Sequence, residues 1–224
     1  RSLRTVHISS AKFTDWEGVY ALPALTHLEL DEKVAVIPDG ISRLRTLTHL
    51  TIRGKRLKAL PADLAKLPAL RHLAIINAPI TALPDDLGRL ETLRLSWTRK
   101  LKTLPETIGP GLKVLEAEQV PLKALPDAVL TSATLEVLTA DATKISKLGA
   151  EIKWPALHTL KLVGTFKTWP KTVSAPALRD VVLEGKFAAL PDLYNPNLIN
   201  FQVSAPLTTV DTRLAGVPDG MQGR

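Results

Sequence analysis

Leucines recur along the chain every 20 to 23 residues, and each one opens the same short pattern of apolar and polar positions. Apolar residues follow three and five positions after each leucine, as Leu50 and Ile52 follow Leu47, and most residues between them are polar. Such alternation over four or five residues is typical of a short strand with one buried face. The pattern therefore predicts ten short strands, which begin near Leu3, Leu25, Leu47, Leu70, Leu90, Leu112, Leu135, Leu157, Leu178 and Leu198.

The second half of most units contains a proline that follows a large apolar residue. These steps are Ile37-Pro38, Leu60-Pro61, Leu83-Pro84, Leu104-Pro105, Leu125-Pro126, Trp169-Pro170 and Leu190-Pro191. Proline suits the first position of a helical turn, where its missing N–H costs no hydrogen bond. Acidic residues such as Asp85 and Asp127 directly follow the proline, at the positive end of such a turn. Each unit is therefore expected to form a strand, a loop, a short helical or 3-10 turn, and a return.

A single unit cannot bury its leucines, but stacked units can. Each fully buried Leu-sized side chain contributes roughly 1.5–3 kcal/mol before conformational entropy is subtracted. Ten parallel strands spaced about 4.8 Å apart predict a concave sheet on the order of 45 Å long. No Gly/Ser linker or block of charge divides the chain. We therefore expect one elongated α/β domain over residues 1–206, followed by a partial terminal repeat or frayed tail over 207–224.

The pattern LxxLxLxxxxLxxLPxxL, which runs from Leu47 to Leu64, resembles that of the leucine-rich-repeat family over essentially the whole chain. The resemblance implies a right-handed, horseshoe-shaped solenoid with a concave parallel sheet and a convex side of short helical or 3-10 turns. The cysteine-free units rich in Leu-Pro steps also resemble repeat domains of bacterial type III effectors. Residues 93–105 resemble Xanthomonas effectors that join such repeats to a ubiquitin-ligase domain. That resemblance implies target recognition inside a host cell, with any catalytic domain outside this fragment.

One column of the repeat departs from the family pattern. The family usually places Asn at the ninth position, where its side-chain amide bonds the backbone of adjacent turns. Here that column reads Ala11, Lys33, Lys55, Ala78, Thr98, Val120, Thr143, Thr165, Lys186 and Pro206. The three threonines can donate a hydroxyl, whereas the other residues cannot replace an amide. Because buried backbone carbonyls still need partners, we expect several irregular or water-bridged turns.

The composition bears on the compartment in which the chain works. The chain contains no cysteine, no Asn-x-Ser/Thr sequon and no apolar run near the roughly 20 residues of a membrane span. These absences favour an intracellular type of chain in a reducing compartment, and we expect no membrane span. The sequence has no basic-then-apolar leader, and its only methionine is Met221, so we expect a fragment of a longer protein. The effector resemblance implies secretion by a bacterium into the host cytoplasm.

Signatures of catalysis and of cofactor binding are missing from the sequence. There is no phosphate loop, no GxGxxG after a strand, no HExxH, no GxSxG and no cysteine nucleophile, so we expect neither an enzyme nor a cofactor. His27, His49 and His72 occupy the same position of three successive units and should form a ladder on the concave face. The outer two strands lie roughly 10 Å apart, whereas zinc needs every donor about 2 Å away, so we expect no metal site. A solvated ladder that contacts a partner and responds to pH is the favoured interpretation.

Charge is distributed unevenly between the strands and the loops. The chain carries a formal net charge of +7, yet its outward strand positions hold more acids than bases. The acids are Glu29, Asp31, Glu116, Glu118, Asp141, Asp180 and Glu184, and the bases are Arg53, Arg94 and Lys161. Most excess cations follow the strands, namely Lys55, Arg56, Lys58, Arg99, Lys100, Lys102, Lys123, Lys144, Lys147 and Lys167. This stripe is interpreted either as a solvated edge or as a site for nucleic acid or an anionic membrane surface. No arginine cluster, row of aromatic residues or RNA-binding signature supports nucleic acid.

Trp97 is the strongest single candidate for partner binding. It occupies the eighth position of the fifth unit, just past the predicted strand, and tryptophan is enriched at binding hot spots. The alternative is that Trp97 packs over a turn shortened by the 20-residue spacing from Leu70 to Leu90. The other tryptophans, Trp16, Trp154 and Trp169, are expected in the core.

We therefore predict a protein-binding module that recognises its partner, a host protein, with its concave face. The predicted site consists of His49, Arg53, His72, Ile76, Arg94 and Trp97, flanked by Glu116 and Glu118. A typical interface needs about 800 Å² on each partner, and a sheet of ten strands can provide this area. The alternative function is electrostatic binding of nucleic acid or an anionic membrane through the lysine-rich edge.

Overall fold

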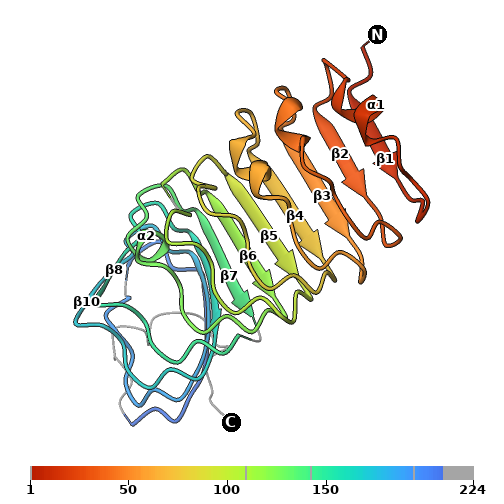
Figure 1. Ribbon diagram of the computed structural model, residues 1–224. Helices are drawn as coiled ribbons and strands as arrows, with labels where there is room; N and C mark the ends of the chain where they lie inside the picture. Colours follow the sequence, from red (N-terminus) through yellow and green to blue (C-terminus); the bar gives the residue numbers. More distant parts are fainter. Residues whose placement is uncertain (1, 109, 142, 194, 209–224) are drawn as a thin grey trace.

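Ten strands lie side by side in one parallel sheet, in the order in which they occur along the chain (Figure 1). The computed structural model describes residues 2–108, 110–141, 143–193 and 195–208. The strands are β1 (Thr5–Ile8), β2 (His27–Leu30), β3 (His49–Arg53), β4 (His72–Ile76), β5 (Thr92–Ser96), β6 (Val114–Glu118), β7 (Val137–Asp141), β9 (Thr159–Val163), β11 (Asp180–Glu184) and β12 (Asn200–Ser204). Each of the ten leucine-initiated segments contains one strand of this sheet, so the predicted solenoid is confirmed.

The strands pair in register, so that equivalent positions of successive units become neighbours. Leu50 of β3 pairs with Leu28 of β2 on one side and with Leu73 of β4 on the other. The same column continues through Leu93 and Leu115, and all of these side chains are at most 1 % exposed. Equal residue types therefore stack in rows along the solenoid. This rule applies equally to the charged and polar columns of the outer face.

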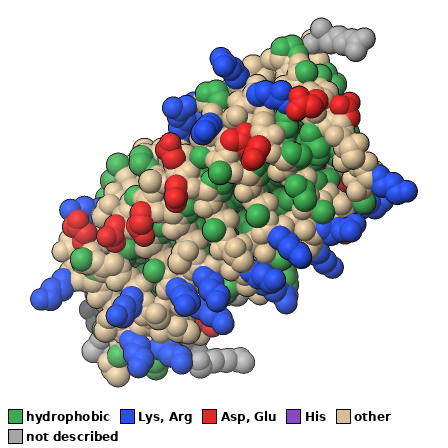
Figure 2. All heavy atoms as spheres, viewed as in Figure 1, with side chains coloured by type: hydrophobic (Ala, Val, Ile, Leu, Met, Phe, Trp, Pro, Cys, Tyr) green, Lys and Arg blue, Asp and Glu red, His purple; other side chains and the backbone are tan. Residues whose placement is uncertain are grey.

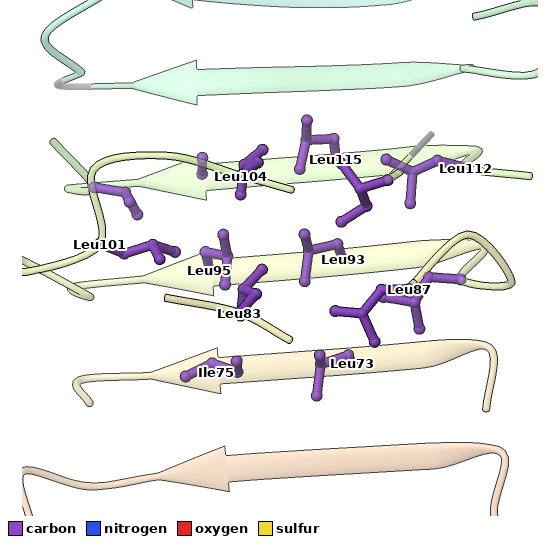
Figure 3. Packing of buried hydrophobic residues seen from close by; sticks show 14 of the residues in the cluster. Leu73, Ile75, Leu83, Leu87, Leu93, Leu95, Leu101, Leu104, Leu112 and Leu115 are labelled. Carbon is purple, nitrogen blue, oxygen red and sulfur yellow. The ribbon is translucent and has the colours of Figure 1, made fainter. Parts of the chain in front are cut away.

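The core is a layer of aliphatic side chains between the sheet and the segments that return behind it. Figure 3 shows Leu93 and Leu95 of β5 beside Leu83, Leu87 and Leu104 from the connecting segments. All five side chains are buried. Repeating such a layer in every unit supplies the hydrophobic stabilisation that one unit alone lacks.

The convex side changes character along the chain. Helical turns cover the earlier units and recur near the middle, as α1 (Trp16–Tyr20), η1 (Ile41–Arg43), η2 (Ala62–Lys66) and α2 (Asp127–Leu130). Later, β8 (Glu151–Lys153) and β10 (Thr172–Ser174) pair as a separate parallel ribbon. The unit of β8 has no Leu-Pro step, and Lys171 rather than an acid follows Pro170 before β10. Both units thus lack the proline–acid pair that favours a helical start.

Aromatic side chains replace aliphatic ones in the later part of the core. Trp154 is fully buried, and its indole N–H donates a 2.8 Å hydrogen bond to the carbonyl oxygen of Val129. Phe166 and Phe187 stack with ring centroids 5.2 Å apart, and Trp169 packs edge-on against both rings. Trp16 is also buried. The three tryptophans expected in the core therefore pack there, with Trp169 partly exposed.

The predicted domain limits extend past the described structure. β12 ends at Ser204, inside the predicted repeat domain over residues 1–206. Most of the predicted tail over 207–224, including the last Leu-Pro-like motif, lies outside the described residues. The division into a repeat domain and a tail stays a prediction.

Candidate protein-binding surface

The eight residues of the predicted site lie on or directly after four neighbouring strands, β3 to β6. His49 pairs with His72, and Arg94 pairs with Glu116, across adjacent strands. A third row joins Arg53, Ile76, Ser96 and Glu118 in register. Trp97 directly follows this row at the end of β5. None of the eight side chains is buried, so the structure brings them together as one solvent-facing surface, which we call the concave patch.

The three histidines form the predicted ladder. The rings of His27 and His49 stack with centroids 4.2 Å apart and planes 12° apart. The rings of His49 and His72 stack at 4.1 Å and 18°. In the described part of the chain, no group of three or more His, Cys, Asp or Glu residues is arranged to hold a metal ion. Face-to-face stacking places the ring nitrogens side by side, whereas a metal needs them to converge on one point.

Threonines that precede the histidines orient their rings. The Thr48 hydroxyl lies 3.1 Å from the carbonyl oxygen of Thr26 and 2.8 Å from Nδ1 of His49. A hydroxyl has a single proton, so when it donates to the carbonyl it accepts from Nδ1–H. This arrangement leaves Nε2 of neutral His49 as an acceptor. The same hydrogen bonds recur one unit earlier between Thr26 and His27.

The ladder resists protonation at its centre. Burial, followed by the charges of His72 and His27, lowers the pKa of His49 below its ordinary value of 6.5. Stacked rings repel each other when charged, because like charges at about 4 Å interact unfavourably. The neutral form of His49 is therefore favoured in the folded chain. The predicted pH response of this surface has a structural basis in this stacking.

The basic residues of the strand surface are all neutralised by acids on neighbouring strands. Arg94 Nε lies 2.8 Å from Glu116 Oε2, and Arg53 Nε lies 2.9 Å from Glu29 Oε1. Farther along, Lys161 Nζ lies 2.6 Å from Asp141 Oδ2. The sequence shows the excess of acids in these positions, but it does not show which acid pairs with which base. Arg94 and Glu116 are direct partners in the register, whereas Lys161 and Arg53 reach acids that lie diagonally on the neighbouring strand.

One acid of the concave patch stays without an ion pair among the described residues. Glu118 is exposed at the end of β6, in the row that contains Ile76. The centre of the patch is small and apolar, because Ala74 and Ile76 of β4 lie beside Arg94 and Arg53 on the neighbouring strands. The patch thus combines an apolar centre, fixed ion pairs and a carboxylate available to a partner.

Trp97 adopts a backbone conformation that is costly for its residue type. Its φ angle is 57°, and its side chain is 43 % exposed. The equivalent positions of neighbouring units hold Gly54, Asn77 and Gln119, with φ angles of 135°, 56° and 54°. Each of these residues donates its backbone N–H to the carbonyl at the end of the next strand, as Trp97 does to Glu118 at 2.9 Å. The column requires a positive φ angle, which Gly and Asn adopt at low cost and a bulky residue adopts only at a higher cost.

Arg99 completes the surroundings of Trp97. The guanidinium carbon of Arg99 lies 4.9 Å from the centroid of the Trp97 ring, at cation–π distance. The sequence groups Trp97 with Arg94 in the predicted site, but the side-chain contact that the structure shows for Trp97 is with Arg99. The positive φ angle of Trp97 was also not predicted from the sequence, although the glycines and Asn77 in the same column indicate it. The side chain of Trp97 is partly open to solvent, and the choice between partner binding and packing over the shortened turn stays a prediction.

The three threonines of the ninth column differ in their hydrogen bonds. The hydroxyls of Thr143 and Thr165 donate to the carbonyl oxygens of Val163 and Ile145, so these two threonines replace the missing amides. Thr98, next to Trp97, is fully buried, and its hydroxyl has no hydrogen-bond partner among the described residues. The turn after β5 is thus irregular in two ways, with a strained Trp97 and an unsatisfied Thr98.

The ten loop cations identified from the sequence lie at the side of the molecule where the strands end. Figure 1 shows the arrows of β1 to β7 ending along one side, and Figure 2 shows Lys and Arg side chains gathered along it. All ten side chains are exposed. Within the described chain, none of them forms an ion pair. We call this set, from Lys55 to Lys167, the basic edge.

Comparison with known proteins identifies the fold. No protein-family model and no curated protein matches the sequence. Among solved structures, the leucine-rich repeat domain of the type III effector XopL is similar over 92 % of this chain and 77 % of that one, with 23 % identity and a TM-score of 0.61. The functional domain of InlJ from Listeria monocytogenes, which includes a cysteine ladder, is similar over 94 % of this chain, with 18 % identity and a TM-score of 0.60. This chain spans 56 % of the InlJ domain's length.

Proposed function

From the leucine-rich-repeat fold of this chain, we propose that it is a protein-interaction module that binds its partner with the concave patch. The observation that carries the proposal is Trp97, a large aromatic side chain exposed at a position that favours Gly or Asn. A bulky residue in the left-handed region costs on the order of 1–3 kcal/mol, and such strain clusters at functional sites. Burial of the exposed Trp97 ring by a partner protein accounts for a strained residue at this position.

The rest of the concave patch has the composition of a binding interface. Interfaces combine a small apolar or aromatic centre with a polar rim, and Trp and Arg dominate their hot spots. Here Ile76 and Trp97 provide the apolar centre, and Arg94, fixed by Glu116, lies beside them. Holding Arg94 in an ion pair reduces the entropy that it loses on binding. The partner that fits is a protein that presents an apolar side chain to Trp97 and a basic side chain to Glu118.

We place the module in a bacterial effector that acts in a host cell, where it selects a target for a catalytic domain outside this fragment. Residues 93–105 carry the sequence resemblance to such effectors, and the effector XopL is among the similar structures. The chain itself contributes recognition rather than catalysis. Fold alone does not fix function, so this assignment rests on the resemblance together with the concave patch.

Affinity capture from a eukaryotic lysate tests the proposal. The wild-type chain is compared with a double variant, Arg94→Ala with Trp97→Ala, and with Ile199→Ala as a control. Ile199 is also a large exposed apolar residue, 62 % exposed, but it precedes β12, far along the sheet from β5. We expect the same set of host proteins from the wild type and the control, and loss of specific proteins with the double variant. Equal recovery by all three chains rejects the concave patch as the binding site.

A further inference from the structure

The ten cations of the basic edge form no ion pair with an acid in the described chain. Elsewhere in the described chain, several cations pair with acids, as Lys113 does with Glu91 at 2.9 Å. The loop segments 55–58, 99–102 and 144–147 contain Lys and Arg but no Asp or Glu. The ten charges of the edge exceed the formal net charge of +7, so the rest of the chain holds more acids than bases. The positive charge of the protein is thus concentrated on one side.

The register of the repeats holds these cations in a line. The backbone N–H of Lys123 donates to the carbonyl oxygen of Lys102 at 3.0 Å, and that of Lys144 donates to Leu122 at 2.8 Å. Successive loops therefore stack with the spacing of the strands, about 4.8 Å. From Lys55 in the third unit to Lys167 in the eighth, the line extends roughly 24 Å. Like charges at such spacing repel one another, and an anionic counterpart relieves that repulsion.

Exposed apolar side chains lie beside the line. The described residues include four exposed large apolar side chains, Leu3, Val36, Trp97 and Ile199. Val36, 66 % exposed, lines a shallow hollow together with Arg56, Lys58 and one acid, Asp39. Trp97 lies against Arg99. Two of the four thus adjoin basic side chains of the edge, a combination typical of proteins that bind at a membrane surface.

We propose that the basic edge binds peripherally to a surface of anionic phospholipid headgroups. Eight of the ten cations are lysines, which act as point charges and do not provide the bidentate geometry of arginine. Single-stranded nucleic acid binds to rows of aromatic side chains, whereas Trp97 is the single exposed aromatic among the large apolar side chains of the described chain. With helices of five residues or fewer, the described chain has no helical segment that reaches across a bilayer, so the contact is at the headgroups.

Co-sedimentation with lipid vesicles tests this proposal. The probes are vesicles of phosphatidylcholine with 30 mol% phosphatidylserine (about two charges in seven lipids) and vesicles of phosphatidylcholine alone. The test variant replaces Lys58, Lys102, Lys123 and Lys167 by Gln. The matched control replaces Arg4, Arg45, Lys66 and Arg89 by Gln, which removes the same charge from residues that precede the strands. All eight residues are exposed, so both variants are expected to fold.

We expect the wild type to bind the anionic vesicles, to bind more weakly as salt rises, and not to bind phosphatidylcholine alone. The edge variant is expected to lose roughly 100-fold or more in partition coefficient, and the control only a few-fold. Val36→Ser is expected to weaken binding several-fold without changing the salt dependence. Equal loss in both quadruple variants, or no binding by the wild type, overturns the proposal. Binding to a single-stranded or duplex oligonucleotide without binding to vesicles also overturns it and assigns the edge to nucleic acid.

This assay is independent of the concave patch. None of the four residues in the edge variant belongs to it, and the edge variant is expected to capture host proteins as well as the wild type does. Loss of vesicle binding with intact capture therefore separates the two surfaces.

Discussion

The concave face and the basic edge are built by the same repeats, yet the cations of the concave face pair with acids and those of the basic edge do not. On the concave face, Arg94 of one strand meets Glu116 of the next. On the edge, Lys102 is followed by Lys123 in the neighbouring loop. In a parallel sheet that pairs in register, the neighbour of a residue is its equivalent in the next unit. The composition of a column therefore decides whether its charge is satisfied internally or is left for a partner.

The largest effect is expected when an acid is introduced among the cations of the basic edge, so that bases and acids lie side by side there as on the concave face. Lys123→Glu places a carboxylate beside Lys102 and lowers the charge of the edge by two. At about 1 kcal/mol for each charge near an anionic surface, binding to phosphatidylserine vesicles is expected to fall by roughly 30-fold. Vesicle co-sedimentation measures the change. The control is Lys66→Glu, which makes the same change of charge on a residue before β4; an equal loss in the control contradicts an edge-specific site.

The next effect concerns the strain at Trp97. Replacing Trp97 by Asn, the residue that Asn77 provides one unit earlier, removes a bulky residue from the left-handed region. We expect the free energy of unfolding to rise by about 1 kcal/mol. Urea denaturation measures this change, with Gln119→Asn as a control that replaces a less bulky residue in the same column. A clear loss of stability in Trp97→Asn shows that the ring contributes packing rather than strain.

A smaller effect is expected for the ion pairs of the concave face. A double-mutant cycle on Arg94 and Glu116 is expected to give a coupling of about 0.2–1 kcal/mol, because both side chains are partly open to solvent. The coupling should decrease at high salt. The same cycle on Lys102 and Lys123 should give a coupling of the opposite sign. Couplings of the same sign in the two pairs contradict the contrast between the two surfaces.

The smallest effect is the pH dependence of the histidine ladder. The pKa of His49 is lowered in the folded chain, so the unfolded chain binds more protons near and below pH 6.5. The contribution of neutral His49 to stability is therefore fully present above pH 6.5 and decreases as the pH falls through the folded pKa. The titratable and charged groups around it are His27 on β2, His72 on β4, and Arg71 and Glu91 beside the ladder.

Replacing His49 by Thr, the residue that Thr92 provides in the same row, tests this dependence. Denaturation between pH 7.5 and pH 5 is expected to show a smaller loss of stability in the variant than in the wild type. His158→Thr is the control, because His158 lies outside the stack. Identical pH profiles for the wild type and His49→Thr contradict a role for the ladder.

The sequence was sufficient to predict the sheet and its rows. In repeats that pair in register, residues at the same position of successive units lie side by side, so their spacing in the sequence predicts their neighbours. Leu28, Leu50 and Leu73 are stacked as their spacing implies. The histidine ladder follows from the same rule. The convex side was less predictable, because short helical turns and short strands differ by little energy in units without a strong start signal. The ribbon of β8 and β10 replaces helical turns for that reason.

The side-chain contacts of the concave patch could not be predicted from the spacing of residues in the sequence. The companion of Trp97 is Arg99, because the left-handed turn sets the direction of the indole ring after β5. The pairing of Arg53 with Glu29 is diagonal, joining one row of β3 to another row of β2. Side-chain length and rotamer decide such contacts, and a repeat pattern does not specify them.

The central claim is that strained, exposed Trp97 anchors a partner protein on the concave patch. The most direct measurement is the dissociation constant of a captured partner for the wild type and for Trp97→Asn, by calorimetry. A hot spot contributes about 2 kcal/mol or more, so the variant is expected to bind roughly 30-fold more weakly while folding at least as stably. Equal dissociation constants for the two chains would contradict the claim.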